Sequence, residues 1–155
     1  MALKKLISNV IDSVEYNITL QEVLDSMINN KTKHFVLLNN KKPVGIITER
    51  DILFLYTKHI NLNLKAIDFA KKCLITSKFN RKINYILGLM LNHKIRRVVI
   101  VDLEENYLGT ILQEKLIYEF EQDIFKTHTK AKDLIKVNLK ATFVQKEVDI
   151  QTAIE

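Results

Sequence analysis

The feature that most constrains this chain is an internal repeat with a period of about sixty residues. Two apolar stretches with the same helical spacing end near Met27 and Met90, and each leads to two strand-like stretches, the second of which contains Gly45 or Gly109. A repeat of this length indicates one structural unit used twice. Because about sixty residues bury only a small core, neither copy is expected to be stable alone, and the two copies are expected to pack against each other.

Local patterns predict the elements of each copy. Thr19 and Glu22 form a capping-box pattern at the start of a helix over 20–28. Apolar and β-branched residues then predict strands at 35–38 and 44–47. The second copy has the same order, with a predicted helix at 83–91 and strands at 98–101 and 107–112. The fold class is therefore α+β, with two pseudo-symmetric helix–strand–strand–helix repeats packed sheet to sheet.

Two further helices are expected from apolar residues at helical spacing. The first lies at the N-terminus, and the second follows the last predicted strand. Their predicted apolar faces are Leu3, Leu6, Ile7, Val10 and Ile11, and Leu116, Ile117, Phe120 and Ile124.

The repeat also predicts domain boundaries. We expect the first repeat at 3–60, the second at 61–127, and in 128–155 the start of a third repeat or a C-terminal extension, because the sequence after Lys130 is similar to that after Lys65. The sequence ends within a helix-like pattern that has no stop signal. This favours a chain cut from a longer protein over a last segment that covers a sheet edge.

The stretch 42–53 carries the clearest candidate site. It predicts a strand that runs directly into a helix, with Thr48 as the N-cap and Asp51 at the third helical position. The free N–H groups of such a helix start can bind an anion or a polar sugar. The same Thr48 and Asp51 pattern is also an ordinary capping box, which needs no ligand.

Composition excludes several other classes of protein. No apolar run approaches the roughly 20 residues that cross a bilayer, so no membrane insertion is expected. The single Cys73 excludes an internal disulfide, and a reducing cytoplasm is the expected location. The four histidines have no ligand spacing, so no metal site is predicted. No nucleophile motif or glycine-rich phosphate loop is present, so we expect no enzyme and no catalytic cofactor.

The tandem arrangement resembles a known family. A helix ending in Met, a strand, a turn and the sequence Val44-Gly45-Ile46-Ile47-Thr48-Glu49-Arg50-Asp51-Ile52-Leu53, followed by a second copy, is similar to the cystathionine-β-synthase (CBS) domain pair, or Bateman module. This resemblance implies a regulatory, non-catalytic module that binds an adenosine-containing ligand in a cleft between the repeats. It also implies a homodimer, for which the candidate surfaces are Leu53, Leu55 and Tyr56, and Leu116, Ile117 and Phe120.

The resemblance also implies roles for particular residues. Asp51 would accept hydrogen bonds from the ribose hydroxyls, with Thr48 and Arg50 nearby, and Ile46 would pack against the base. The remaining ligand-binding residues implied are Leu74, Ile75 and Thr76 along the adenine, Arg96 and Arg97 at the phosphate, and Lys33 and His34 as further groups near phosphate. In the second copy, Leu112 and Lys115 replace Thr48 and Asp51, so we expect one nucleotide site rather than two.

Three functions remain to be compared. The first is a regulatory module that senses AMP, ADP or ATP and controls an output domain, which could lie beyond the C-terminus. S-adenosylmethionine and cyclic di-adenylate stay open as ligands, although the basic residues favour a phosphate over a sulfonium. The second is a ligand-free structural dimerisation module of a larger signalling protein. The third, nucleic-acid binding through the net charge of +6, is disfavoured because the lysines are scattered.

Overall fold

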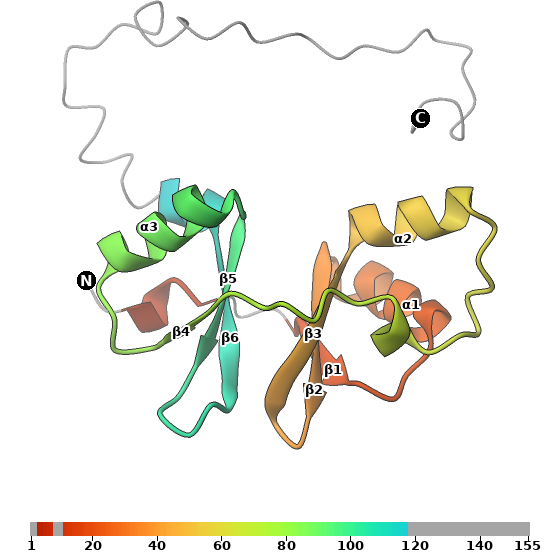
Figure 1. The fold of residues 1–155 in the computed structure, drawn as a ribbon, viewed down its shortest axis with the longest axis horizontal. Coiled ribbons are helices and arrows are strands. Elements are labelled where there is room, and N and C mark those ends of the chain that lie inside the picture. Colours follow the sequence, from red (N-terminus) through yellow and green to blue (C-terminus); the bar gives the residue numbers. More distant parts are fainter. Residues whose placement is uncertain (1–2, 8–10, 118–155) are drawn as a thin grey trace, which may run out of the picture. The chain divides into compact units, whose positions relative to one another are not determined.

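Two three-stranded sheets, one from each repeat, form the framework of the computed structural model, which describes residues 3–7 and 11–117. The strands are β1 (Ser13–Glu15), β2 (His34–Asn39), β3 (Lys42–Thr48), β4 (Thr76–Lys78), β5 (Arg97–Val101) and β6 (Tyr107–Leu112) (Figure 1). In each sheet the first strand runs parallel to the central strand and the third runs antiparallel to it. The register shifts at Leu37/Leu38 in one sheet and at Ile100/Val101 in the other, which are equivalent positions of the repeat.

The helices confirm the predicted order of elements. They are α1 (Leu20–Asn30), α2 (Glu49–Thr57) and α3 (Ile83–His93), with short 3-10 helices at Leu3–Lys5 and Ala66–Asp68 and a helical segment at 113–117. Helix α1 begins with the predicted capping box, in which Thr19 N–H donates to Glu22 at 2.7 Å. Helices α1 and α3 both end at a lysine in the left-handed conformation, Lys31 with φ of 50° and Lys94 with φ of 52°. The two copies therefore share their helix ends as well as their strands.

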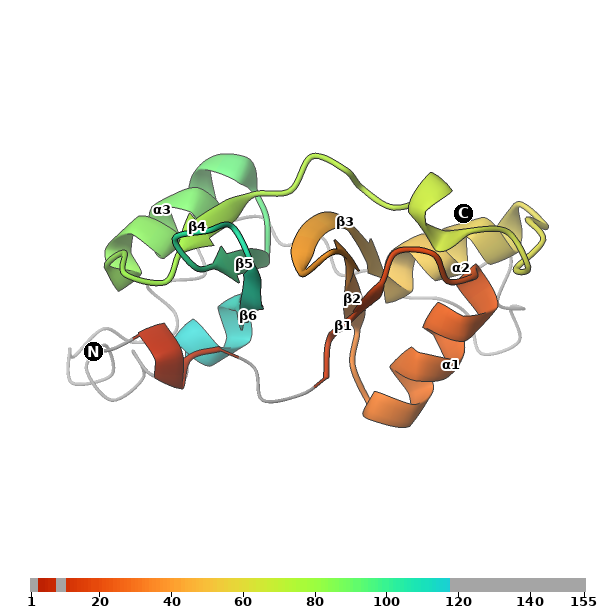
Figure 2. The same cartoon turned by 90° about the horizontal axis from the view of Figure 1, so that it is seen from below.

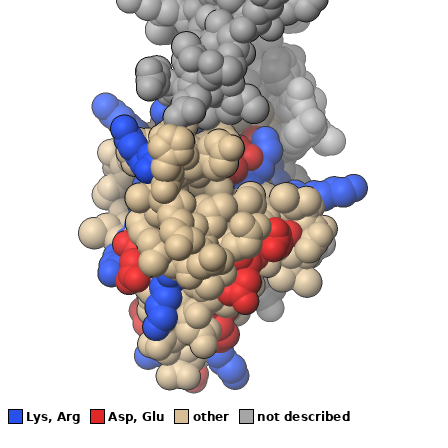
Figure 3. Space-filling view, turned by 90° about the vertical axis from the view of Figure 1, so that its right-hand side faces the viewer, with Lys and Arg blue, Asp and Glu red and all other residues tan. Residues whose placement is uncertain are grey.

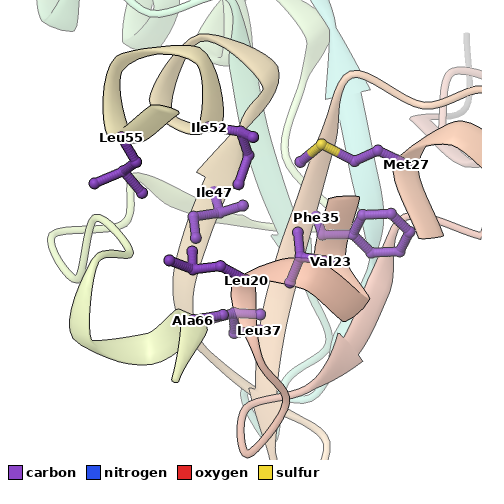
Figure 4. Packing of buried hydrophobic residues seen from close by; sticks show 9 residues of the cluster. All are labelled: Leu20, Val23, Met27, Phe35, Leu37, Ile47, Ile52, Leu55 and Ala66. Atoms are coloured by element: carbon purple, nitrogen blue, oxygen red, sulfur yellow. The ribbon is translucent and has the colours of Figure 1, made fainter. Parts of the chain in front are cut away.

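The first repeat has a core between its helices and one face of its sheet (Figure 4). Residues three and four apart on α1 point toward the central strand, since they share one face of the helix. In Figure 1 and Figure 2 each sheet carries the helices of its own repeat on one face. The buried residues of this core are Leu20, Val23, Met27, Phe35, Leu37, Ile47, Ile52, Leu55 and Ala66.

A second apolar cluster joins the two sheets, and both sheets belong to one structural unit. Side chains alternate between the faces of a strand, so Phe35 and Leu37 contact the helices while Val36 points the other way. Val36 packs with Val99 and Val101 of β5. The central strands are therefore buried on both faces, and the predicted packing of sheet to sheet is confirmed.

The N-terminal segment differs from the predicted helix. Residues Leu3–Lys5 form a single 3-10 turn, and Ile7 then pairs antiparallel with Ile111 of β6 in the second sheet. Lys115 strengthens this contact, since its Nζ donates to the carbonyl of Ile7 at 3.4 Å. Leu3 and Leu6 are buried whereas Ile11 is 66% exposed, and the pairing of Ile7 with β6 replaces the helical arrangement that the spacing predicted.

Some predictions concern residues that are not described. The expected third repeat or extension at 128–155, and the helix positions Phe120 and Ile124, lie outside the described residues. In the part of the chain that the structure does describe, no helix has the length and apolar character needed to span a membrane.

Candidate functional site

The candidate site is built at the point where β3 passes into α2. Thr48 is the N-cap of α2, and its hydroxyl and its N–H both donate to Oδ2 of Asp51, at 2.6 Å and 2.9 Å. The predicted capping box is therefore present. It occupies one oxygen of the carboxylate and holds the Asp51 side chain beside the start of the helix.

The second oxygen of Asp51 is bonded by a lysine that the sequence analysis did not include. Lys71 Nζ lies 2.8 Å from Oδ1 of Asp51. Burial by itself would raise the pKa of Asp51, but the hydrogen bonds from Lys71 and Thr48 together outweigh it and hold this pKa below its ordinary value. Asp51 is therefore an ionised carboxylate at neutral pH, with its two oxygens held by different partners.

Lys71 reaches Asp51 because its backbone lies alongside β3. The N–H of Lys71 donates to the carbonyl of Ile46 at 2.9 Å, and the N–H of Ile46 donates to the carbonyl of Lys71 at 3.0 Å. Gly45 permits this close approach, since a Cβ at that position would lie 3.0 Å from the Cβ of Ala70. The absence of a side chain at Gly45 therefore allows the segment before β4 to pack directly against β3.

Arg97, the first residue of β5, adds a charge from the second repeat. Its half-buried guanidinium has a pKa lowered by burial, while the negative charges of Glu49, Glu114 and Asp51 act in the opposite direction. The Nε of Arg97 is buried and has no hydrogen-bond partner among the described residues. Buried donors without a partner are uncommon in folded proteins, and this one lies at the start of β5.

The remaining predicted residues fall into two groups around this point. Leu74 and Ile75 are half-buried and lead into β4, where the carbonyl of Ile75 accepts from the N–H of Val99 at 3.2 Å. Ile46 packs in the cluster between the sheets. Exposed side chains belong to Lys33, Arg50, Thr76 and Arg96.

Backbone hydrogen bonds hold the pair Lys33 and His34 and the pair Arg96 and Arg97 at equivalent positions of the two repeats. The carbonyl of Lys33 accepts from the N–H of Glu49 at 3.1 Å, and that of Arg96 accepts from the N–H of Gln113 at 2.9 Å. Each bond ties the residue before a central strand to the helix start after the neighbouring strand. Lys33 is therefore fixed beside the first turn of α2, where Asp51 also lies.

The structure does not bring the His34 side chain to the surface with these groups. It is 3% exposed, and its Nε2 lies 3.4 Å from Oδ2 of the buried Asp12. Asp12 also accepts a hydrogen bond of 2.7 Å from the hydroxyl of Tyr107 on β6. Asp12 was missed by the sequence analysis, although an acidic residue among apolar neighbours is a signal of a buried polar contact.

The equivalent position of the second repeat is arranged differently. Leu112 replaces the capping Thr48, and Lys115 replaces Asp51, as the sequence indicates. The Lys115 ammonium contacts the carbonyl of Ile7 instead of an N-cap. Within the described ranges, no group of three or more His, Cys, Asp or Glu side chains lies together in a way that could hold a metal ion.

Comparison with known proteins identifies the first repeat directly. Residues 3–58 match the family model of the CBS domain. A search of curated proteins found no match for the sequence.

Solved structures with the same fold extend the likeness to both repeats. The CBS domain protein PAE2072 from Pyrobaculum aerophilum, complexed with AMP, has a TM-score of 0.73 at 23% identity, over 82% of this chain and 100% of its own. The CBS domain pair of protein MJ0100, in complex with 5′-methylthioadenosine and S-adenosyl-L-methionine, has a TM-score of 0.70 at 22% identity, over 79% of this chain and 98% of its own. A CBS domain pair/ACT domain protein from Thermotoga maritima has a TM-score of 0.65 at 18% identity, over 80% of this chain and 99% of its own.

MJ0100 and the Thermotoga maritima protein each contain a CBS domain pair. This chain matches the CBS domain model at its first repeat, and its described residues have the fold of a tandem CBS domain pair.

Proposed function

We propose that this chain is a regulatory module that binds an adenine nucleotide, AMP, ADP or ATP, beside Asp51. The observation that carries the proposal is the Asp51 carboxylate, which is fixed at the start of α2 by Thr48 and lies within the electrostatic reach of Arg97 from the second repeat. A site formed by both repeats can respond to their relative arrangement. The AMP complex of the Pyrobaculum aerophilum protein and the 5′-methylthioadenosine and S-adenosyl-L-methionine complex of MJ0100 support a ligand of this class.

The chemistry of the residues suits a nucleotide. An ionised carboxylate accepts hydrogen bonds from both vicinal hydroxyls of a ribose, and Asp51 stands at the positive end of a helix dipole. Guanidinium groups bind phosphate with two hydrogen bonds, which suits Arg97 and the neighbouring exposed Arg96. Ile46 and Ile75 are half-buried apolar side chains of the kind that packs against a base. Lys33 and Arg50, both exposed near the start of α2, stay predicted groups near the ligand, whereas the side chain of His34 is buried beside Asp12.

Ligand titration of the wild-type chain and two variants tests the proposal. At about a hundred times its dissociation constant, a ligand should add about 2.7 kcal/mol to the free energy of unfolding. For a domain of this size this raises the melting temperature by roughly 5–10 °C. Asp51→Ala should lose the shift with AMP, ADP and ATP, whereas Asp25→Ala, at an exposed position of α1, should keep it.

The outcomes separate the candidate functions. Unchanged melting curves with these nucleotides, S-adenosylmethionine and cyclic di-adenylate would refute nucleotide sensing. A shift that survives Asp51→Ala would place the ligand elsewhere and contradict the proposed site.

A second candidate function, dimerisation, is favoured by exposed apolar residues on α2. Leu53, Phe54 and Tyr56 are 46%, 56% and 64% exposed. Figure 3 views the side of the molecule that carries α1 and α2, and uncharged residues occupy the centre of this face with charged side chains around them. Contiguous exposed apolar side chains often mark a contact with another protein. We therefore propose α2 as the homodimer surface.

Two of the residues suggested for this surface are placed differently. Leu55 is 8% exposed and belongs to the core of the first repeat, and Leu116 is 1% exposed. Ile117 is exposed, and Phe120 lies outside the described residues. Sedimentation at micromolar concentration should show a dimer for the wild type and a monomer for Tyr56→Glu. A wild-type monomer would refute this assignment but would not bear on the proposed nucleotide site.

A further inference from the structure

We propose that Lys71 is an exchangeable counter-ion of the site: it holds Asp51 in the free protein and passes to the phosphate of the bound nucleotide, so that the site selects anionic ligands. This inference rests on the proposed nucleotide function and adds a specificity-determining residue to it. Its basis is the contact of 2.8 Å between Lys71 Nζ and Asp51 Oδ1.

Lys71 competes directly with a ribose. Oδ2 of Asp51 is already bonded by the hydroxyl and N–H of Thr48, and those bonds also cap α2. Oδ1 is therefore the oxygen that a pair of vicinal hydroxyls must use. Because Lys71 occupies Oδ1 in this structure, a ligand that binds Asp51 through its ribose has to displace the ammonium.

The side chain of Lys71 can be displaced without disturbing the fold. Its main chain is fixed to Ile46 by two hydrogen bonds, whereas its side chain is 64% exposed. An ion pair with an exposed lysine contributes little to stability, because water solvates the ammonium when the pair opens. The main chain of Lys71 is therefore fixed while its ammonium group can move, and its flexible methylene chain allows the ammonium to bind another partner close to Asp51.

The charge of the ligand determines whether this exchange is favourable. A nucleotide that takes Oδ1 also brings a phosphate, to which the released ammonium can bind as a point charge. An uncharged nucleoside takes Oδ1 and gives Lys71 no new partner. Removing the ammonium should therefore weaken the binding of a nucleotide and strengthen the binding of a nucleoside.

Calorimetric titration of Lys71→Met with AMP and adenosine tests this opposite response. The expected result is tighter binding of adenosine, by about the fivefold that one solvated ionic contact contributes, because the ammonium no longer competes for Oδ1. AMP should bind more weakly, because the lost contact with the doubly charged phosphate is stronger than the contact with Asp51 that it replaces. Adenosine affinity is measured by displacement of AMP, so that weak binding is still quantified. Lys72→Met removes the same charge one residue further along the chain and should leave both affinities unchanged, and Lys71→Arg should preserve the preference for AMP.

The possible outcomes distinguish the inference from the function on which it rests. If Lys71→Met leaves the preference for AMP over adenosine unchanged, the counter-ion exchange is refuted and nucleotide binding stands. A folded wild-type chain that binds neither ligand refutes both. Melting curves of each variant without ligand show that the protein is folded.

Discussion

Tyr107 on β6 makes a buried contact that we expect to contribute strongly to the stability of the repeat pair. Its hydroxyl donates to Oδ1 of Asp12 at 2.7 Å and lies 2.9 Å from Oγ1 of Thr110. Asp12 is 4% exposed and precedes β1, which belongs to the other sheet. Burial, and then the charge of Asp12, raise the pKa of Tyr107 well above its ordinary value, so the hydroxyl stays protonated and remains a donor.

The substitution Tyr107→Phe removes this donor while it keeps the ring. The Asp12 carboxylate would retain its contact with the ring nitrogen of His34 at 3.4 Å but would lose the hydrogen bond to its Oδ1. A hydrogen bond to a charged group contributes about 1.5–3 kcal/mol, and the buried acceptor left without it adds to the loss. At about 2–4 °C for each kcal/mol in a domain of this size, the melting temperature should fall by roughly 3–12 °C.

Urea unfolding and scanning calorimetry of Tyr107→Phe measure this effect. Tyr85→Phe is the matched control, because Tyr85 is 48% exposed and its ring contact with Arg81 does not need the hydroxyl. The control should unfold within about 0.5 kcal/mol of the wild type. If Tyr107→Phe does the same, the contact between the sheets contributes nothing measurable and the reasoning is refuted.

Two further predictions follow from the site. In urea unfolding, Gly45→Ala should lower the free energy of unfolding by about 1–3 kcal/mol, because the new Cβ would meet Ala70 at 3.0 Å. The control Gly88→Ala in α3, where a Cβ meets nothing within 4 Å, should instead raise it by about 0.5–1 kcal/mol. Equal effects of the two substitutions would contradict this reasoning. The pKa of Asp51 is lowered from its ordinary value of 3.8, so its bonds stabilise the fold above that pH and are lost as the pH falls through the lower folded value. The stability difference between wild type and Asp51→Asn should therefore shrink below about pH 4 in acid titrations, and a constant difference would refute it.

Most of the fold could be predicted because most helices and strands are specified by residues close together in the sequence. The capping box at Thr19 and the apolar spacing that follows it are sufficient to define α1. By contrast, β1 has three residues and no strong pattern, and it exists because it pairs with β2. The N-terminal segment likewise has helical spacing, but pairing of Ile7 with Ile111 decides its conformation. Such long-range pairing cannot be read from a single stretch of sequence.

The candidate site likewise contains contacts that local sequence predicts and contacts that only the fold creates. Thr48 and Asp51 are three residues apart, so the sequence was sufficient to predict their contact. Lys71 is placed by the close packing at Gly45, which is a property of the fold, and no local sequence pattern indicates its contact with Asp51. His34 was predicted near phosphate because it matches Arg97 in the repeat, whereas its neighbour Asp12 and its burial become visible only when the strands are in place.

The pairing of the N-terminal segment with the second sheet has a consequence for synthesis. Ile7 and Lys115 are in contact but lie 108 positions apart in the chain. At about 5–20 residues per second, a ribosome makes the partner of this segment on the order of 5–20 s after the segment itself. During that interval Ile7 has no β6 strand to pair with, and Leu3 and Leu6 in the same segment are almost fully buried only in the finished protein. Chaperone binding would therefore protect this chain most while the first repeat has been synthesised and β6 has not.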